Sequence, residues 1–163
     1  MTTEVPRALS GRLSFLLGRL YMRALDLEAR ELDTLGVSVK QHAVLALLAE
    51  EGPMTQQHLG RRLGIDRTTV VTVVDGLEQA NLVERRRSPA DRRAYLLTLT
   101  PDGVRAGEQG HELVSGAEDE LLGALDEDER RTLTDLLGRA VRSQNSGDAD
   151  ADADAPPRPG SER

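Results

Sequence analysis

Apolar residues recur every three or four positions along most of this chain, the spacing that places them on one face of an α-helix. Serine, threonine or aspartate precedes these segments, and their side chains accept hydrogen bonds from the N–H groups of a first helical turn. Glycines at positions 36, 52 and 64 mark three helix ends. We therefore expect helices that begin at Ser10, Ser38, Thr55, Asp66, Thr100 and Asp126.

One stretch alternates between apolar and polar residues instead, which is the pattern of a half-buried strand. It covers residues 82–87 and 94–99, and the intervening Ser88-Pro89-Ala90-Asp91 has the composition of a turn. From Thr55 to Thr100 the sequence thus predicts helix, turn, helix and hairpin, a winged helix-turn-helix. In that arrangement one helix enters the DNA major groove while the wing reaches along the backbone.

The fourth expected helix contains the one ambiguous segment of this pattern. Its run from Val70 to Val74 is rich in β-branched residues, which by propensity favour a strand. The cap at Asp66 and the helical spacing of the apolar positions from Val70 to Leu77 favour a helix. The predicted fold is mainly α with a small β-wing.

The first, fifth and sixth expected helices each carry an apolar face that little else in 163 residues can cover. We expect both ends of the chain to build a helical dimerisation region from these faces. After Ser143 the Asp-Ala repeats and prolines cannot form a core. The expected divisions are an N-terminal dimerisation helix (1–36), a winged helix-turn-helix DNA-binding domain (37–100), C-terminal dimerisation helices (101–142) and a disordered acidic tail (143–163).

The net charge of −7 is unevenly distributed along the chain. Between Arg61 and Arg93, eight arginines face five acidic residues, whereas residues 102–135 hold eleven acids and three arginines. Attraction for phosphate depends on the local field, so the basic middle segment favours DNA as a partner. With only three aromatic residues for base stacking, duplex DNA is favoured over single strands.

Composition also excludes several classes of function. The chain has no cysteine, and therefore no disulfide, thiolate metal site or cysteine redox switch. It has no apolar run of membrane-spanning length and no secretory signal pattern at its start, so we expect a soluble cytoplasmic protein. No nucleophile, metal set or phosphate loop accompanies its carboxylates, and we expect neither an enzyme nor a cofactor.

The candidate DNA contacts lie on the second helix of this unit and on the wing. Threonine hydroxyls can bond phosphate, and their methyl groups can meet thymine. An arginine on a protruding loop is well placed to enter a narrow minor groove. Neighbours on a strand point to opposite faces, so Arg86 or Arg87 is a better candidate than Arg85. The candidates are Arg67, Thr68, Thr69, Thr72, Arg86, Arg87, Arg92 and Arg93.

These motifs resemble the MarR family of bacterial transcription regulators over roughly residues 10–142. The most specific element is the wing signature from Asp91 to Thr100, which fits the family pattern D-x-R…L-T. Leu63-Gly64-Ile65-Asp66 and Gly76-Leu77-Glu78 also resemble the family's helix-turn-helix. The resemblance implies a homodimer that binds a pseudo-palindromic operator and is often released by a small anionic or aromatic effector.

The resemblance also suggests roles for individual residues. Arg93 matches the wing arginine that enters the minor groove, and Asp91 matches the carboxylate that orients it. Arg67, Thr68, Thr69 and Thr72 match the recognition-helix face. The peroxide-sensing branch of the family uses a reactive cysteine, which this chain lacks.

An effector site is expected in a cleft between the first, second and fifth helices, because domain junctions favour small-molecule binding. Leu20, Ala24, His42 and His111 are its candidate lining. Some family members bind zinc through histidines on the second and fifth helices, but this chain has no H-x-x-x-H pair, and we expect no metal. Two alternative functions stay open, a winged-helix module that binds protein and a non-specific architectural DNA-binding protein.

Overall fold

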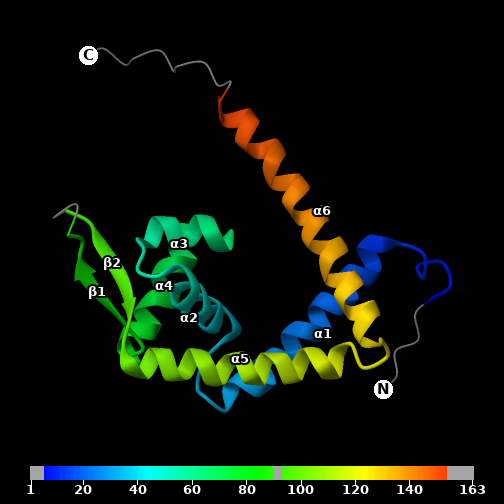
Figure 1. Cartoon of the computed structure of the whole chain (residues 1–163), viewed down its shortest axis with the longest axis horizontal. Coiled ribbons are helices and arrows are strands. Elements are labelled where there is room, and N and C mark those ends of the chain that lie inside the picture. Colours follow the sequence, from blue (N-terminus) through cyan, green and yellow to red (C-terminus); the bar gives the residue numbers. More distant parts are fainter. Residues whose placement is uncertain (1–5, 90–92, 154–163) are drawn as a thin grey trace. The chain divides into compact units, whose positions relative to one another are not determined.

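The computed structural model describes residues 6–89 and 93–153. The chain divides into two compact units, one ending at Leu121 and the other starting at Leu122. The first contains α1 (Leu13–Asp33), α2 (Val39–Glu51), α3 (Gln56–Leu63), α4 (Arg67–Gln79), β1 (Val83–Arg87), β2 (Tyr95–Leu99) and α5 (Pro101–Leu121). The second contains α6 (Glu127–Ala153) (Figure 1). The mainly helical fold with a two-stranded wing is as predicted.

The caps expected for α2, α3 and α4 are confirmed. Ser38 and Gln41 form a reciprocal capping box, with hydrogen bonds of 3.2 and 2.9 Å. The Thr55 hydroxyl accepts from the His58 N–H at 3.2 Å. Gly64, in the left-handed region with φ of 64°, ends α3, which is the conformation that glycine adopts without strain.

The first helix is shorter than predicted at both ends. It begins at Leu13 rather than next to Ser10, because the Ser10 hydroxyl donates to the Arg7 carbonyl in a preceding turn and caps no helical N–H. It ends at Asp33, before Gly36. The intervening residues form turns that connect α1 to α2.

The core of the first unit lies among α2, α3, α4 and the hairpin. Val70, Val73, Val74 and Leu77 are buried on one face of α4, so the helical spacing and not the β-propensity of the valine run decides the structure. Each fully buried side chain of this size contributes roughly 1.5–3 kcal/mol. The same core includes Val44, Leu45, Leu48, Leu59, Val83 and Leu97.

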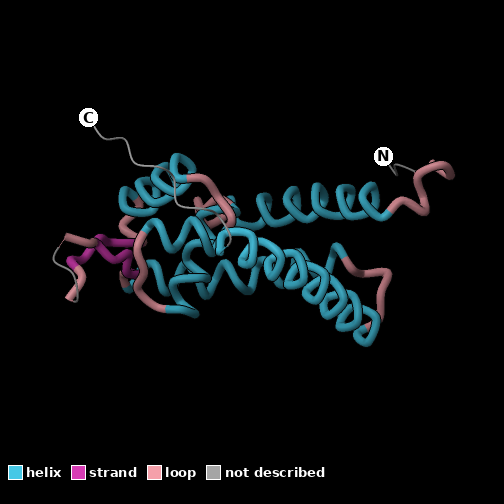
Figure 2. The backbone as a smooth tube through the Cα atoms, turned by 90° about the horizontal axis from the view of Figure 1, so that it is seen from above, coloured by secondary structure: helices cyan, strands magenta, loops and turns pink. Residues whose placement is uncertain are grey.

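The wing is an antiparallel hairpin whose register runs from the Val83–Leu99 pair to the Arg87–Tyr95 pair. Met54 and Leu97 exchange two backbone hydrogen bonds, of 3.3 and 2.8 Å, and so join β2 to the segment before α3. Figure 2 shows the two strands at one end of the helices of this unit. Ala90, Asp91 and Arg92 lie outside the described residues.

The start of α5 is fixed by Thr100, as predicted. Its hydroxyl accepts from the Gly103 N–H at 3.0 Å and donates to the Asn81 carbonyl at 2.7 Å. A Cβ at Gly103 would lie 1.9 Å from the Leu82 carbonyl oxygen, and one at Gly110 would lie 2.4 Å from the His42 ring. Small residues on α5 therefore allow it to pack closely against the Leu82 backbone and against α2.

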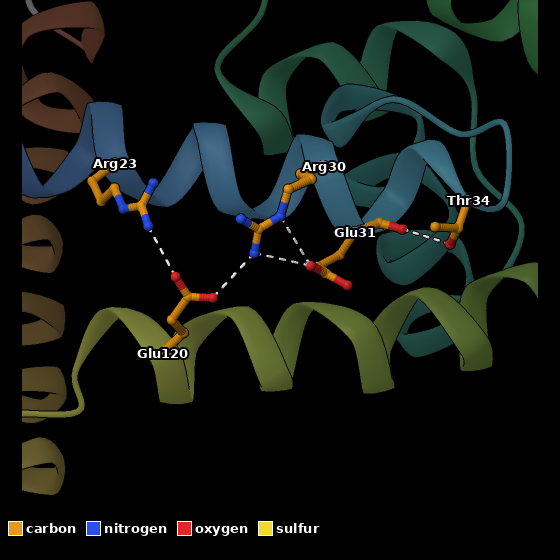
Figure 3. Close-up of polar contacts among 5 residues, drawn as sticks. All are labelled: Arg23, Arg30, Glu31, Thr34 and Glu120. Atoms are coloured by element: carbon orange, nitrogen blue, oxygen red, sulfur yellow. Dashed lines mark hydrogen bonds and ion pairs between the residues drawn. The ribbon is translucent and has the colours of Figure 1, made fainter. Parts of the chain in front are cut away.

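Ion pairs connect α1 to the last turn of α5. Glu120 accepts hydrogen bonds from Arg23 at 2.9 Å and from Arg30 at 3.1 Å, and Arg30 also pairs with Glu31 (Figure 3). These side chains are half exposed, so each pair contributes little by itself. The Glu120 carboxylate thus bridges two arginines of α1.

The second unit is the sixth helix and the turn that precedes it. Asp126 and Glu129 exchange backbone-to-side-chain hydrogen bonds of 2.9 Å, the capping pair that the sequence predicts. The fifth helix ends at Leu121, and Leu125, expected on its apolar stripe, lies in the connecting turn.

The structure also differs from the sequence prediction after Ser143. Residues 144–153 continue α6 instead of forming an irregular tail. Extending an existing helix requires no new nucleus, and the alanines of this segment favour the helical backbone. The end of the expected tail, residues 154–163, lies outside the described residues.

Candidate nucleic-acid interface

The N-terminal half of α4 presents a polar, solvent-facing surface. Arg67, Thr68 and Thr72 are exposed there, next to exposed Val71. The Thr72 hydroxyl donates to the Thr68 carbonyl at 3.1 Å. Three of the four residues expected on the recognition face are therefore accessible to a partner.

Thr69 is placed differently from its neighbours. It is half-buried, and its hydroxyl donates to the Asp66 carboxylate at 2.6 Å. That bond, together with the backbone N–H groups of Thr69 and Thr68, lowers the pKa of Asp66 below its ordinary value. Asp66 thus acts as an ionised helix cap, as predicted, and the Thr69 hydroxyl has no proton left to donate to another partner.

A groove of about 1040 Å³ lies between α3, α4 and the inner side of the wing. Its described lining contains no carboxylate and includes Arg61, Arg67, Arg85 and Tyr95. Arg61 and Arg67 form no ion pair with any residue of ranges 6–89 and 93–153. The groove therefore carries the positive charges of Arg61 and Arg67, which suit a polyanion.

The three consecutive arginines of β1 have different surroundings. Arg85 pairs with Asp75 at 2.8 Å and with Glu78 at 2.7 Å, both on α4. Arg86 pairs with Glu84 at 2.5 Å on the same strand, and its side chain is 65% exposed. Arg87 is exposed at the tip-proximal end of the strand.

The wing tip holds the remaining predicted contacts. Arg93 is exposed at the start of the returning strand segment. Asp91 and Arg92, the other two predicted wing-tip residues, lie outside the described residues.

The four residues expected to bind an effector do not line either of the two grooves identified. The second groove, about 380 Å³, lies between α2, β2 and α5. His42 is buried against Leu32 and Gly110, whereas His111 is exposed. Leu20 is exposed and Ala24 half-buried on α1. The structure brings the two histidines near each other.

His42 is the most unusual titratable group in this region. Burial lowers the pKa of the ring, a hydrogen bond with the Gly107 backbone opposes that shift, and the nearby His111 lowers it further. Its Nε2 atom is buried without a hydrogen-bond partner among the described residues. The folded protein therefore favours a neutral His42 ring.

Several groove residues were missed from the sequence. Arg61, Gln56 and Gln57 lie on α3. Gln57 and Arg61 are each two residues from the buried Leu59, and this helical spacing is a signal that they are exposed, whereas Gln56 shares the Leu59 side and is half-buried. Tyr95 was noted only as a rare aromatic residue, although the alternation of β2 places it beside Arg87 in the hairpin register.

Together, the capped helix pair, the core-packed hairpin and the acid-free groove define a winged helix-turn-helix protein. A family model described as "MarR family" matches residues 35–94. A putative transcriptional regulatory protein for the hcr operon of Thauera aromatica is 33% identical over 143 residues, covering 87% of this chain and 86% of that protein. The chain belongs to the MarR family of transcriptional regulators.

Solved structures agree with this assignment. A mutant of E. coli MarR in complex with operator DNA has a TM-score of 0.71 at 29% identity, covering 78% of this chain and 92% of that one. CouR from Rhodococcus jostii RHA1, bound to p-coumaroyl-CoA, has a TM-score of 0.72 at 28% identity, covering 81% and 93%. In the described residues, no helix is long and apolar enough to cross a membrane.

Proposed function

We propose that this regulator binds a pseudo-palindromic duplex operator as a homodimer in the cytoplasm and represses transcription until a small anionic or aromatic molecule releases it. The observation that carries the proposal is the acid-free groove between α3, α4 and the wing in a protein of net charge −7. Arginines in a groove whose described lining holds no carboxylate support DNA as the partner.

Within this proposal, α4 lies in the major groove. Arg67, Thr68 and Thr72 meet base edges or phosphates, and Thr69 contributes its methyl group or its hydroxyl oxygen as an acceptor. Arg86 and Arg87 lie along the phosphate backbone. Arg93 enters the minor groove, and the proposed roles of Arg92 beside it and of Asp91 in orienting it come from the family pattern.

The dimer is supported by apolar surface that the single chain leaves uncovered. On α1, Leu13, Tyr21 and Met22 are 69%, 63% and 60% exposed. On α6, Leu136 and Val141 are 53% and 61% exposed. Large apolar side chains exposed in this way on two helices support an interaction surface, and a second copy of the chain is the partner that a two-fold symmetric operator requires.

The proposed effector site lies where α1, α2 and α5 meet. His42 supports it, because its buried Nε2 acceptor lacks a partner among the described residues and an acidic hydroxyl could donate to it. CouR, a structural neighbour, was solved with an aromatic thioester bound. Leu20, Ala24 and His111 are the other proposed lining residues.

A gel shift with the DNA upstream of the protein's own gene tests the proposal, followed by titration with phenolic acids, zinc and peroxide. We expect a specific shift that a phenolic acid reverses and that peroxide leaves unchanged, since there is no cysteine to oxidise. Release by low micromolar zinc that His42→Ala abolishes would contradict the proposed effector. Equal binding to unrelated duplexes would favour an architectural role.

A further inference from the structure

One arginine connects the wing directly to the recognition helix. Arg85 on β1 places Nη2 2.8 Å from the Asp75 carboxylate and Nη1 2.7 Å from the Glu78 carboxylate. Asp75 and Glu78 lie one helical turn apart on α4, so the planar guanidinium spans both. We call this set of contacts the Arg85 bridge.

Strand alternation explains why Arg85 makes this contact and its neighbours do not. Arg85 points to the same side of β1 as Val83, which is buried against the core. Arg86 points to the other side, where it pairs with Glu84. The arginine that faces α4 is therefore the one that forms ion pairs with carboxylates of that helix.

The Arg85 bridge lies where the hairpin is anchored to the rest of its unit. Arg85 is opposite Leu97 in the hairpin register, and Leu97 pairs with Met54 through two backbone hydrogen bonds. The hairpin is thus held on both strands at one level, by ion pairs on β1 and by a backbone bridge on β2. Arg86, Arg87 and Tyr95 lie beyond this level, toward the wing tip.

We propose that Arg85 is a positioning residue for DNA binding, which acts through Asp75 and Glu78 to fix the angle of the wing relative to α4 without contacting DNA itself. The inference rests on the proposed function and assigns Arg85 a part in it. A two-stranded hairpin is marginally stable by itself, so its orientation must come from such contacts. A wing held in place before binding loses less conformational freedom when its tip enters the groove of the DNA.

Neutralising the carboxylates separates positioning from direct contact, because the two predict opposite signs. The pair Asp75→Asn and Glu78→Gln removes two negative charges beside the DNA and releases Arg85. If Arg85 bound phosphate, this variant would bind operator more tightly. If Arg85 positions the wing, the variant binds more weakly, by about tenfold, even though its charge favours DNA.

A double-mutant cycle with the wing tip gives the second test. We expect Arg85→Gln to weaken operator binding about tenfold in the wild-type background and less than about twofold in an Arg93→Ala background, since a wing that no longer inserts gains nothing from orientation. Arg105→Gln, which removes an exposed, ion-paired arginine on α5, is the matched control and should show no coupling to Arg93.

Both tests are made on the full chain, with thermal unfolding measured for each variant. Additive losses from Arg85→Gln and Arg93→Ala, or tighter binding by the Asp75→Asn, Glu78→Gln variant, would overturn the inference. Equal losses on operator and unrelated DNA would also overturn it and assign the Arg85 bridge to folding alone. If Arg85→Gln fails to fold, the carboxylate variant decides. Failure of the wild type to prefer its operator would instead contradict the proposed function.

Discussion

Arg93, an exposed arginine near the wing tip, gives the first prediction for a single residue. We expect Arg93→Ala to weaken operator binding by roughly 1–3 kcal/mol and to make the salt dependence shallower by about one unit of slope. Arg93 is exposed, so thermal unfolding should hardly change. Fluorescence anisotropy across a series of salt concentrations measures both effects, and unchanged affinity at matched salt would remove the wing tip from the mechanism.

The lowered pKa of His42 gives a second single-residue prediction, which concerns the pH dependence of stability. Burial lowers the pKa of its ring below 6.5, so near that pH the unfolded chain binds a proton that the folded chain does not. The contribution of His42 to stability is therefore complete above about pH 6.5 and is lost as the pH falls toward the folded-state pKa.

The test compares urea unfolding at about pH 7.5 and about pH 5.5. The wild type should lose stability across this interval, and His42→Gln should lose less, because a neutral amide cannot titrate. His58→Gln, at an exposed histidine of α3, is the control and should behave like the wild type. An equal pH dependence in wild type and His42→Gln would contradict the assignment.

Among the elements, α5 offers a matched pair of glycines. A Cβ at Gly103 would collide with the Leu82 backbone carbonyl, whereas a Cβ at Gly116 would meet nothing within 4 Å. We expect Gly103→Ala to destabilise the protein by at least about 1–3 kcal/mol through overpacking. Gly116→Ala should stabilise it by up to about 1 kcal/mol, since alanine is the better helix former. Guanidinium unfolding of both variants measures the difference, and equal effects would show that α5 does not pack closely at Gly103.

The elements also show how far the sequence determines the structure. Ser38, Thr55, Asp66 and Thr100 are local signals, because a cap needs only the next few residues, and the structure confirms each one. Ser10 fails because its hydroxyl has a competing acceptor in the preceding turn. The end of α6 was also misjudged, since compositional polarity predicts the absence of a core but not the absence of a helix.

The candidate interface was less predictable than the elements that build it. The exposed faces of Arg67, Thr68 and Thr72 follow from helical periodicity. The groove lining on α3 and the ion pairs of Arg85 depend on how close different elements lie to one another. The spacing of residues within one helix or strand gives no information about those distances. For Thr69 the sequence shows the spacing but not the hydrogen bond to Asp66.

For the whole molecule, the uncovered apolar faces of α1 and α6 predict the effects of truncation. Removing residues after Leu125 deletes α6, and the apolar surface that α6 would cover in the proposed dimer becomes exposed. We therefore expect monomers or insoluble protein. Removing only residues after Ser146 leaves Leu136 and Val141 in place and should preserve the dimer and specific binding. Light scattering and anisotropy test both, and a soluble monomer that binds operator after the larger deletion would refute the proposed dimer.

The central claim is that this protein reads a DNA sequence, and an affinity ratio tests it most directly. Full-length protein is titrated, at physiological salt, into a duplex carrying the upstream site and into a scrambled duplex of the same length and composition. The account predicts binding to the site that is at least about a thousandfold tighter, the range of specific regulators. Equal affinity for the two duplexes, or no binding to either, would contradict it.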